Sequence, residues 1–167
     1  MEIVVNDTNI FIDLHYIGLL ESFFALPIKV HTVDFVINEI TIKEQLDEVN
    51  KFVIQGNLNV QSFSPEELME IFLLHSNANG NVSLTDCSVW HYALKNNYTL
   101  LTGDAQLRKK AIESNVTVKG IIYIFDLLVE NQIITPQQAA NKLSELKMIN
   151  KRLPRKIIDE RIEKWKV

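Results

Sequence analysis

The sequence predicts an α/β protein with three layers, in which helices cover both faces of a central parallel sheet of about five strands. Two observations support this fold class. Short apolar runs rich in β-branched residues alternate along the chain with longer segments whose apolar residues recur at helical spacing. Strands that alternate with helices normally pair in parallel through right-handed crossovers, which places helices on both faces of the sheet.

The first predicted strand ends at an acidic residue. Residues 3–5 are Ile, Val and Val, a run typical of a strand buried on both faces, and the run stops at Asn6 and Asp7. Apolar residues from Ile10 to Leu20 then keep helical spacing, which predicts a helix over residues 9–20. Asp7 therefore lies at the carboxyl end of a parallel strand, where such sheets bind ligands. A simple helix cap is the alternative role for Asp7.

The remaining strands are predicted at residues 28–31, 57–63, 99–102 and 116–119. A helix capped by Thr32 or Asp34, and continuing to about Leu46, separates the second strand from the third. Its apolar stripe places Glu39 on the inward half of the helix. Gly103 and Asp104 follow the strand at 99–102, so a second acid stands at a strand end.

Helix starts are marked by capping residues. Ser64 and Pro65 begin a helix that ends near residue 76, before a polar loop in which Gly80 is expected to supply a left-handed cap. Ser83 begins the next helix, and Asp86 three residues later completes a capping box. A helix at 105–114 and three C-terminal helices at 121–129, 135–147 and 154–166 complete the prediction.

Composition indicates one globular domain. Hydrophobic residues make up 47% of the 167 residues and charged residues 23%, which are ordinary values. The single cysteine, Cys87, excludes an internal disulfide and fits a reducing compartment. Because no segment approaches eighteen uninterrupted apolar residues, neither a membrane span nor a signal peptide is expected.

Charge is unevenly distributed along the chain. From Lys142 onward nine basic residues face four acidic ones, a local excess of five positive charges. Since the whole chain carries −4, residues 1–141 carry −9. An acidic body is not the usual surface of a protein that grips nucleic acid, so any phosphate bound there needs a cation beside it.

Four acids are candidates for one site: Asp7 and Asp104 after strands, Asp86 in a first helical turn, and Glu39 on an inward helix face. Carboxylates that converge repel each other, which raises their pKa values or requires cations. Oxygen ligands without a histidine or cysteine pattern favour Mg²⁺ or Mn²⁺ over zinc. Such ions activate water and orient a phosphodiester, so the pattern points to hydrolysis of phosphate esters.

Four short motifs stand in the order found in the PIN-domain nuclease family, which the chain resembles. They are Val5-Asn6-Asp7-Thr8-Asn9, Val36-Ile37-Asn38-Glu39-Ile40, Ser83-Leu84-Thr85-Asp86 and Leu101-Thr102-Gly103-Asp104. Leu107, Arg108 and Ala111 are similar to residues of small prokaryotic, VapC-like members. The resemblance spans about residues 3–125 and suggests a nuclease domain at 1–130 with a C-terminal helical extension at 131–167.

The resemblance implies an endoribonuclease that depends on one or two Mg²⁺ or Mn²⁺ ions, and the cytoplasm is the expected location because neither a membrane span nor a signal peptide is predicted. Asp7, Asp86 and Asp104 would hold the metal, and Glu39 would hold a ligand water or help to deprotonate the nucleophile. Hydrogen bonds that orient these carboxylates are expected from Thr8, Asn9, Ser83 and Thr102. Many VapC-like members are toxins paired with an antitoxin and are often dimers, so RNA, an antitoxin and a second copy are the expected partners.

Several alternatives stay open at this point. A degenerate PIN domain would bind RNA or protein without cutting, and an interaction module would use the four acids only as caps and surface charge. A phosphatase with an aspartyl nucleophile needs a second aspartate two positions after Asp7, where Asn9 stands. Asp34 is a reserve ligand near Glu39. Because the body is acidic, RNA contact is assigned to the basic tail and to Arg108, Lys109 and Lys110.

Overall fold

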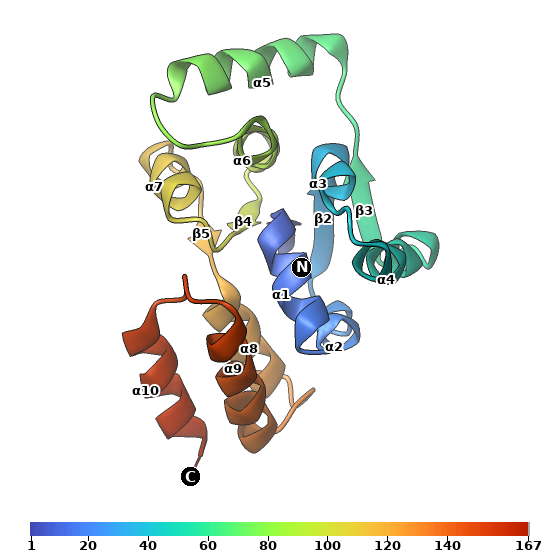
Figure 1. Ribbon diagram of the computed structural model, residues 1–167. Coiled ribbons are helices and arrows are strands. Elements are labelled where there is room, and N and C mark those ends of the chain that lie inside the picture. Colours follow the sequence, from blue (N-terminus) through green and yellow to red (C-terminus); the bar gives the residue numbers. More distant parts are fainter. Residues whose placement is uncertain (167) are drawn as a thin grey trace.

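The computed structural model describes residues 1–166 and contains a five-stranded sheet in which every strand is parallel to its neighbours (Figure 1). The strands are β1 (Ile3–Asn6), β2 (Lys29–Val33), β3 (Leu58–Gln61), β4 (Thr99–Leu101) and β5 (Val118–Lys119). Their order across the sheet is β3-β2-β1-β4-β5. The predicted central parallel sheet is therefore confirmed.

Strand β1 lies in the middle of the sheet. Val5 pairs with His31 of β2 on one side and with Leu100 of β4 on the other. Both Val4 and Val5 are fully buried, because helices cover both faces of this strand. The chain leaves β1 toward β2 and later returns to β4 on the opposite side, so the carboxyl end of β1 is a topological switch point, where open α/β sheets bind ligands.

Helices form the two outer layers and the C-terminal part of the chain. They are α1 (Thr8–Tyr16), α2 (Leu20–Phe24), α3 (Asp34–Glu39), α4 (Lys43–Ile54), α5 (Pro65–Asn77), α6 (Leu84–Asn96), α7 (Ala105–Glu113), α8 (Ile121–Glu130), α9 (Pro136–Ile149) and α10 (Arg155–Trp165). Helix α6 packs on β1, β2 and β4, with α5 and α7 beside it in the upper part of Figure 1. Helices α1, α2 and α8 lie in the lower part, where α1 also contacts α3 and α4.

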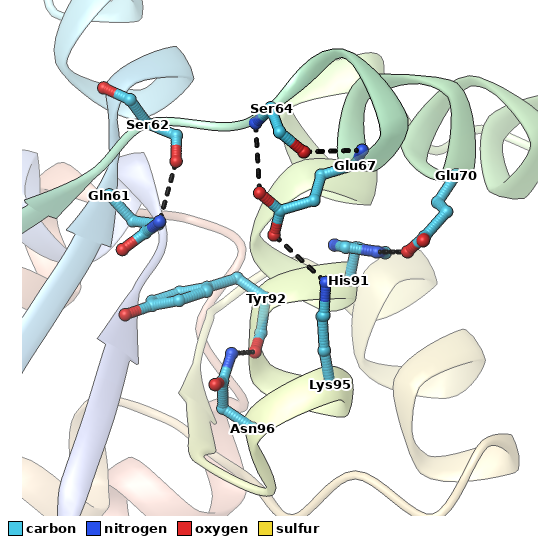
Figure 2. Close-up of polar contacts among 9 residues, drawn as sticks. All are labelled: Gln61, Ser62, Ser64, Glu67, Glu70, His91, Tyr92, Lys95 and Asn96. Carbon is cyan, nitrogen blue, oxygen red and sulfur yellow. Dashed lines mark hydrogen bonds and ion pairs between the residues drawn. The ribbon is translucent and has the colours of Figure 1, made fainter.

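The pair α5 and α6 is joined by polar contacts that Figure 2 shows in detail. Ser64 and Glu67 form the capping box that begins α5, with each side chain bonded to the other residue's backbone N–H. The second oxygen of Glu67 accepts a hydrogen bond from Lys95 on α6, at 3.2 Å. His91 of α6 is buried and contacts Glu70 of α5 at 2.6 Å. These contacts position α6, the helix whose first turn carries Asp86.

Two predicted helices are each divided in the structure. The helix predicted at 9–20 is broken after Tyr16, because Gly18 takes a left-handed conformation (φ +70°) and α2 starts at Leu20. The helix predicted from Asp34 to Leu46 ends at Glu39, because Ile40 is extended and buries its side chain in the core. Glu39 is thus the last residue of a short helix, and its side chain is exposed instead of facing inward.

Two predicted helix caps are also wrong. Thr32 belongs to β2 and donates its hydroxyl to the carbonyl oxygen of Asn6 at 2.8 Å, while Val33 precedes α3 without a side-chain cap. Helix α5 ends at Ala78 in right-handed conformation, so Gly80 does not cap it; the positive φ angles of Asn79 and Gly80 belong to the loop beyond.

The C-terminal helices α9 and α10 pack against each other and reach the rest of the chain through α8. Arg161 of α10 makes two hydrogen bonds with the carboxylate of Asp126 on α8, at 2.8 and 2.7 Å. Trp165 is buried against Phe125 of α8, with ring centroids 6.2 Å apart. Within residues 1–166, none of the helices has the length and apolar character needed to cross a lipid bilayer.

Candidate metal centre

The end of β1 and the end of β4 place two acids at the same edge of the sheet. Asn6 pairs with Leu101, and the backbone N–H of Asp7 donates to the carbonyl oxygen of Leu101 at 2.9 Å. Because the strands are parallel neighbours, the residues that follow them, Asp7 and Thr102-Gly103-Asp104, emerge side by side. The pairing predicted from the strand ends is present in the structure.

Asp7 is buried, with only 3% of its surface exposed. One carboxylate oxygen (Oδ1) accepts a hydrogen bond from the backbone N–H of Thr8 at 2.8 Å, which caps helix α1. The other (Oδ2) accepts the hydroxyl of Thr102 at 2.7 Å. The capping role foreseen as an alternative is therefore real, and it leaves lone pairs on both oxygens for a further ligand.

Asp104 is tied to Asp7 through Thr102. The Thr102 hydroxyl accepts the backbone N–H of Asp104 at 3.1 Å while it donates to Asp7. The Oδ1 atom of Asp104 accepts the N–H of Leu107 at 2.8 Å and so caps helix α7. Thr102 is buried, so this hydroxyl is a fixed link between the carboxylate of Asp7 and the backbone of Asp104.

Asp86 and Glu39 complete the acidic group. Asp86 accepts the backbone N–H of Ser83 at 2.9 Å, and the Ser83 hydroxyl accepts the N–H of Asp86 at 3.0 Å, which is the predicted capping box. Glu39 accepts the hydroxyl of Thr8 at 2.6 Å. Thr8, next to Asp7 in the chain, thus holds the exposed Glu39 side chain over the end of β1.

All four acids line one cavity of about 340 Å³. Its walls also contain Thr8, Asn9, Ile12 and Ser83, so every residue predicted to hold or orient the metal, except Thr102, is part of its surface. Thr102 lies behind Asp7 and Asp104 and acts through its two hydrogen bonds. Ile12, the one apolar lining residue, was missed by sequence reasoning, since it looks like any other position of an amphipathic helix.

The negative charge of the acidic cavity favours the binding of a cation. Burial, followed by the nearby charges of Asp86 and Glu39, raises the pKa of Asp7 to about 6, against the bonds from Thr102 and Thr8 that lower it. Burial also raises the pKa of Asp86, with further contributions from Asp104 and Glu39. No lysine, arginine or histidine of residues 1–166 lines this cavity to offset the charge.

The donor set fits a divalent ion that prefers oxygen ligands, such as Mg²⁺ or Mn²⁺. Within residues 1–166, no three acidic, histidine or cysteine side chains already converge on a single point as a metal-binding group. Converging carboxylates repel one another when no cation is present, which disfavours a preformed coordination shell. The cavity that these four carboxylates share is what makes this edge of the sheet a candidate metal centre.

Other predicted residues lie elsewhere. Arg108 and Lys109 are exposed on α7 and line none of the cavities described here, and Lys110 lines a separate cavity between α5, α6 and α7. Asp34 is outside the acidic cavity, and its buried Oδ1 atom has no hydrogen-bond partner among residues 1–166. Lys151 and Arg152 of the tail, by contrast, line a second cavity that shares Asn9 and Asp104 with the acidic one.

Comparison with known proteins identifies the family. A model of the PIN domain matches residues 3–167, so this chain belongs to the PIN-domain family. PIN domains are generally nucleases, and PIN nucleases generally use divalent metal ions. No protein of curated function matches the sequence.

Two solved structures with TM-scores above 0.5 share the fold. A PilT N-terminus domain protein from the archaeon Sulfolobus solfataricus P2 is 17% identical, with a TM-score of 0.51 over 77% of this chain and 94% of that one. PAE2754 from Pyrobaculum aerophilum is 16% identical, with a TM-score of 0.52 over 80% and 97% of the two chains. VapBC2 from Rickettsia felis, bound to a DNA fragment from its promoter, is 16% identical over 71% and 98%, with a TM-score of 0.48.

Proposed function

We propose that this protein is a metal-dependent endoribonuclease that hydrolyses RNA phosphodiester bonds in the acidic cavity. The observation that carries the proposal is the convergence of Asp7, Glu39, Asp86 and Asp104 on one cavity without a compensating cation. Membership of a family of nucleases supports hydrolysis of a phosphodiester as the reaction class. The choice of RNA over DNA rests on the motifs that resemble VapC-like members.

Asp7, Asp86 and Asp104 are the proposed metal ligands. Each uses at least one oxygen to cap a helix, which fixes the carboxylate without consuming all of its lone pairs. Thr102 orients Asp7 and Asp104 together, and Ser83 orients Asp86. The three aspartates would hold a divalent ion, whose Lewis acidity would serve to activate a water molecule and to stabilise the leaving oxygen.

Glu39 is the proposed proton acceptor. It is exposed on the rim of the cavity, and only its Oε2 atom is engaged, by the hydroxyl of Thr8. The Oε1 atom is free of hydrogen bonds from residues 1–166 and can accept a proton from the attacking water. Thr8 fixes the position of this carboxylate, so Thr8 is a positioning residue.

A cleavage assay tests the proposal. A mixed-sequence single-stranded RNA and the DNA of the same sequence are incubated with the parent and with Asp7→Asn, in Mg²⁺, in Mn²⁺ and in EDTA. The parent should cut the RNA internally only when a divalent ion is present, and Asp7→Asn should not cut. Cutting by both proteins, or by the parent in EDTA, contradicts the proposed mechanism. Cutting of DNA alone contradicts the choice of substrate.

The same assay separates the main alternative. A degenerate PIN domain would bind RNA without cutting it, so a parent that binds and never cuts, with either ion, supports that function instead. An antitoxin partner and a homodimer are further proposals, taken from the resemblance to VapC-like proteins. Their test is the mass of the native protein in solution, alone and after co-expression with the gene product encoded beside it.

A further inference from the structure

A second cavity of about 580 Å³ adjoins the acidic one. The two share Asn9 and Asp104 as wall residues, so they are neighbours at the edge of the sheet. The second cavity extends from there between α1, the start of α7 and the turn that joins α9 to α10. Besides the shared residues its walls include Tyr16, Asn150, Lys151 and Arg152.

The turn between α9 and α10 is fixed against the rest of the chain. The side-chain amide of Asn150 donates to Asp13 of α1 at 3.0 Å, and its carbonyl oxygen accepts the backbone N–H of Arg152 at 3.0 Å. The backbone N–H of Asn150 also donates to Leu146 at 2.8 Å. One asparagine therefore anchors the turn to α1 and shapes it, which holds Lys151 and Arg152 beside the acidic cavity.

The walls of this second cavity combine two cations and an aromatic ring with the carboxylates of Asp13 and Asp104, and the Asp13 carboxylate accepts the amide of Asn150. Lys151 and Arg152 are exposed, and neither takes part in an ion pair among residues 1–166. Tyr16 is 51% exposed, which is high for an aromatic side chain. A ring available for stacking and unpaired cations are the features with which proteins hold single-stranded nucleic acids.

We propose that this cavity binds the nucleotide next to the scissile phosphate of a single-stranded RNA, with Tyr16 stacking on the base and Lys151 and Arg152 contacting the backbone phosphates. This inference rests on the proposed function and names a substrate-binding role for the C-terminal helical part of the chain. The acidic cavity repels phosphates, so a strand that enters it needs compensating cations close by. Lys151 and Arg152 are the cations that the fold supplies at its border.

A peptide is a poorer occupant of this cavity. A segment suited to the acidic cavity would carry positive charge, and Lys151 and Arg152 would repel it where the two cavities meet. The phosphates of an RNA strand would instead be attracted by Lys151 and Arg152 where the strand passes from the acidic cavity to the second cavity. The order of acidic cavity, aromatic ring and cations therefore favours nucleic acid.

Fluorescence anisotropy with a labelled single-stranded RNA of about 10 nucleotides tests the inference, since such sites span about 4–16 nucleotides. Binding is measured in Ca²⁺ over a range of salt concentrations, with the integrity of the probe checked on a gel. The test variant is Lys151→Gln/Arg152→Gln. The matched control is Lys29→Gln/Lys51→Gln, which removes two positive charges from exposed positions of β2 and α4 outside the cavity. Tyr16→Leu and Tyr16→Phe test stacking.

The cavity variant should bind RNA about tenfold more weakly at 0.15 M salt, and its log–log salt slope should be smaller by about 1.4, as for two lost phosphate contacts on a single strand. The RNA affinity of the control variant should stay within about twofold of the parent's, because salt screens charges that lie away from the bound strand. Tyr16→Leu should weaken binding by about fivefold or more, and Tyr16→Phe should restore it.

Equal losses of RNA affinity in the cavity variant and in the control variant, or no loss in either, overturn the inference. The cavity would then bind another ligand, such as a protein segment. Circular dichroism and thermal unfolding of each variant separate lost contacts from lost structure. A parent that cuts RNA while the cavity variant binds normally overturns this inference alone. A parent that binds RNA through Lys151 and Arg152 without cutting overturns the nuclease proposal alone, and a parent that does neither overturns both.

Discussion

Replacing Asp7 by asparagine should stabilise the metal-free protein at neutral and alkaline pH. Burial and the neighbouring acids raise the pKa of Asp7 from its ordinary value of 3.8 to about 6. The folded state therefore binds this proton more tightly than the unfolded state does, and stability falls as pH rises from about 4 to 6. The difference corresponds to about 3 kcal/mol of unfolding free energy, at about 1.4 kcal/mol for each tenfold change in proton affinity.

Asparagine removes that penalty and keeps both partners in contact, although the bond with Thr102 reverses its direction. Its carbonyl oxygen can accept the N–H of Thr8, and its amide can donate to the hydroxyl oxygen of Thr102. The unfolding free energy of the variant should therefore exceed that of the parent by up to about 3 kcal/mol above pH 7. For a chain of this size, this difference corresponds to roughly 6–12 °C in Tm. Near pH 4, where Asp7 is protonated in the folded parent, the two proteins should be equally stable.

Urea unfolding in EDTA from pH 4 to pH 8 measures this difference. Asp47→Asn is the matched control, because Asp47 is an exposed aspartate paired only with Lys43, and its loss should change stability by less than about 1 kcal/mol at any pH. A parent as stable as Asp7→Asn at pH 8, or a difference that does not depend on pH, would refute the claim that Asp7 is an uncompensated buried charge.

Three other substitutions each test one contact of the structure. Thr102→Val removes the hydroxyl that links Asp7 to Asp104, and it should lower Mn²⁺ affinity by about 10–100-fold in a calorimetric titration; unchanged affinity would exclude an orienting role. Glu39→Gln can still accept the Thr8 hydroxyl, so it should slow RNA cleavage by about 10²–10⁴-fold with little change in RNA affinity, and a parallel loss of affinity would argue against proton transfer. Trp165→Ala should cost about 3–5 kcal/mol of unfolding free energy, because the ring is buried against Phe125; a loss below about 1 kcal/mol would show that α10 adds little to the fold.

The sequence was sufficient for the sheet and for the grouping of acids. Buried β-branched runs that alternate with helices, as β1 does, favour interior parallel strands, and parallel strands bring their carboxyl ends to one edge. That geometry alone brings Asp7 and Asp104 together. Asp86 was located by its capping box with Ser83, a local pattern that tertiary packing seldom overrides.

Features that depend on tertiary contacts were not predictable in the same way. Helical spacing continues through Ile40, yet the chain ends α3 there so that this side chain can enter the core, and Glu39 becomes an exposed rim residue as a result. Thr32 resembles a helix cap in sequence but bonds to Asn6 across the sheet. The second cavity depends on one side-chain contact between Asn150 and Asp13, 137 residues apart in the chain, which no local pattern signals.

Isothermal titration with Mn²⁺ at pH 8 measures whether the acidic cavity binds a divalent ion. The parent should bind Mn²⁺ at the acidic cavity. The Asp7→Asn variant should bind Mn²⁺ at least about tenfold more weakly, because it lacks one of the carboxylates proposed to hold the ion. The Asp47→Asn control should titrate like the parent. Equal Mn²⁺ affinity in the parent and in Asp7→Asn, or no binding to the parent, would show that Asp7 does not hold a divalent ion in this cavity.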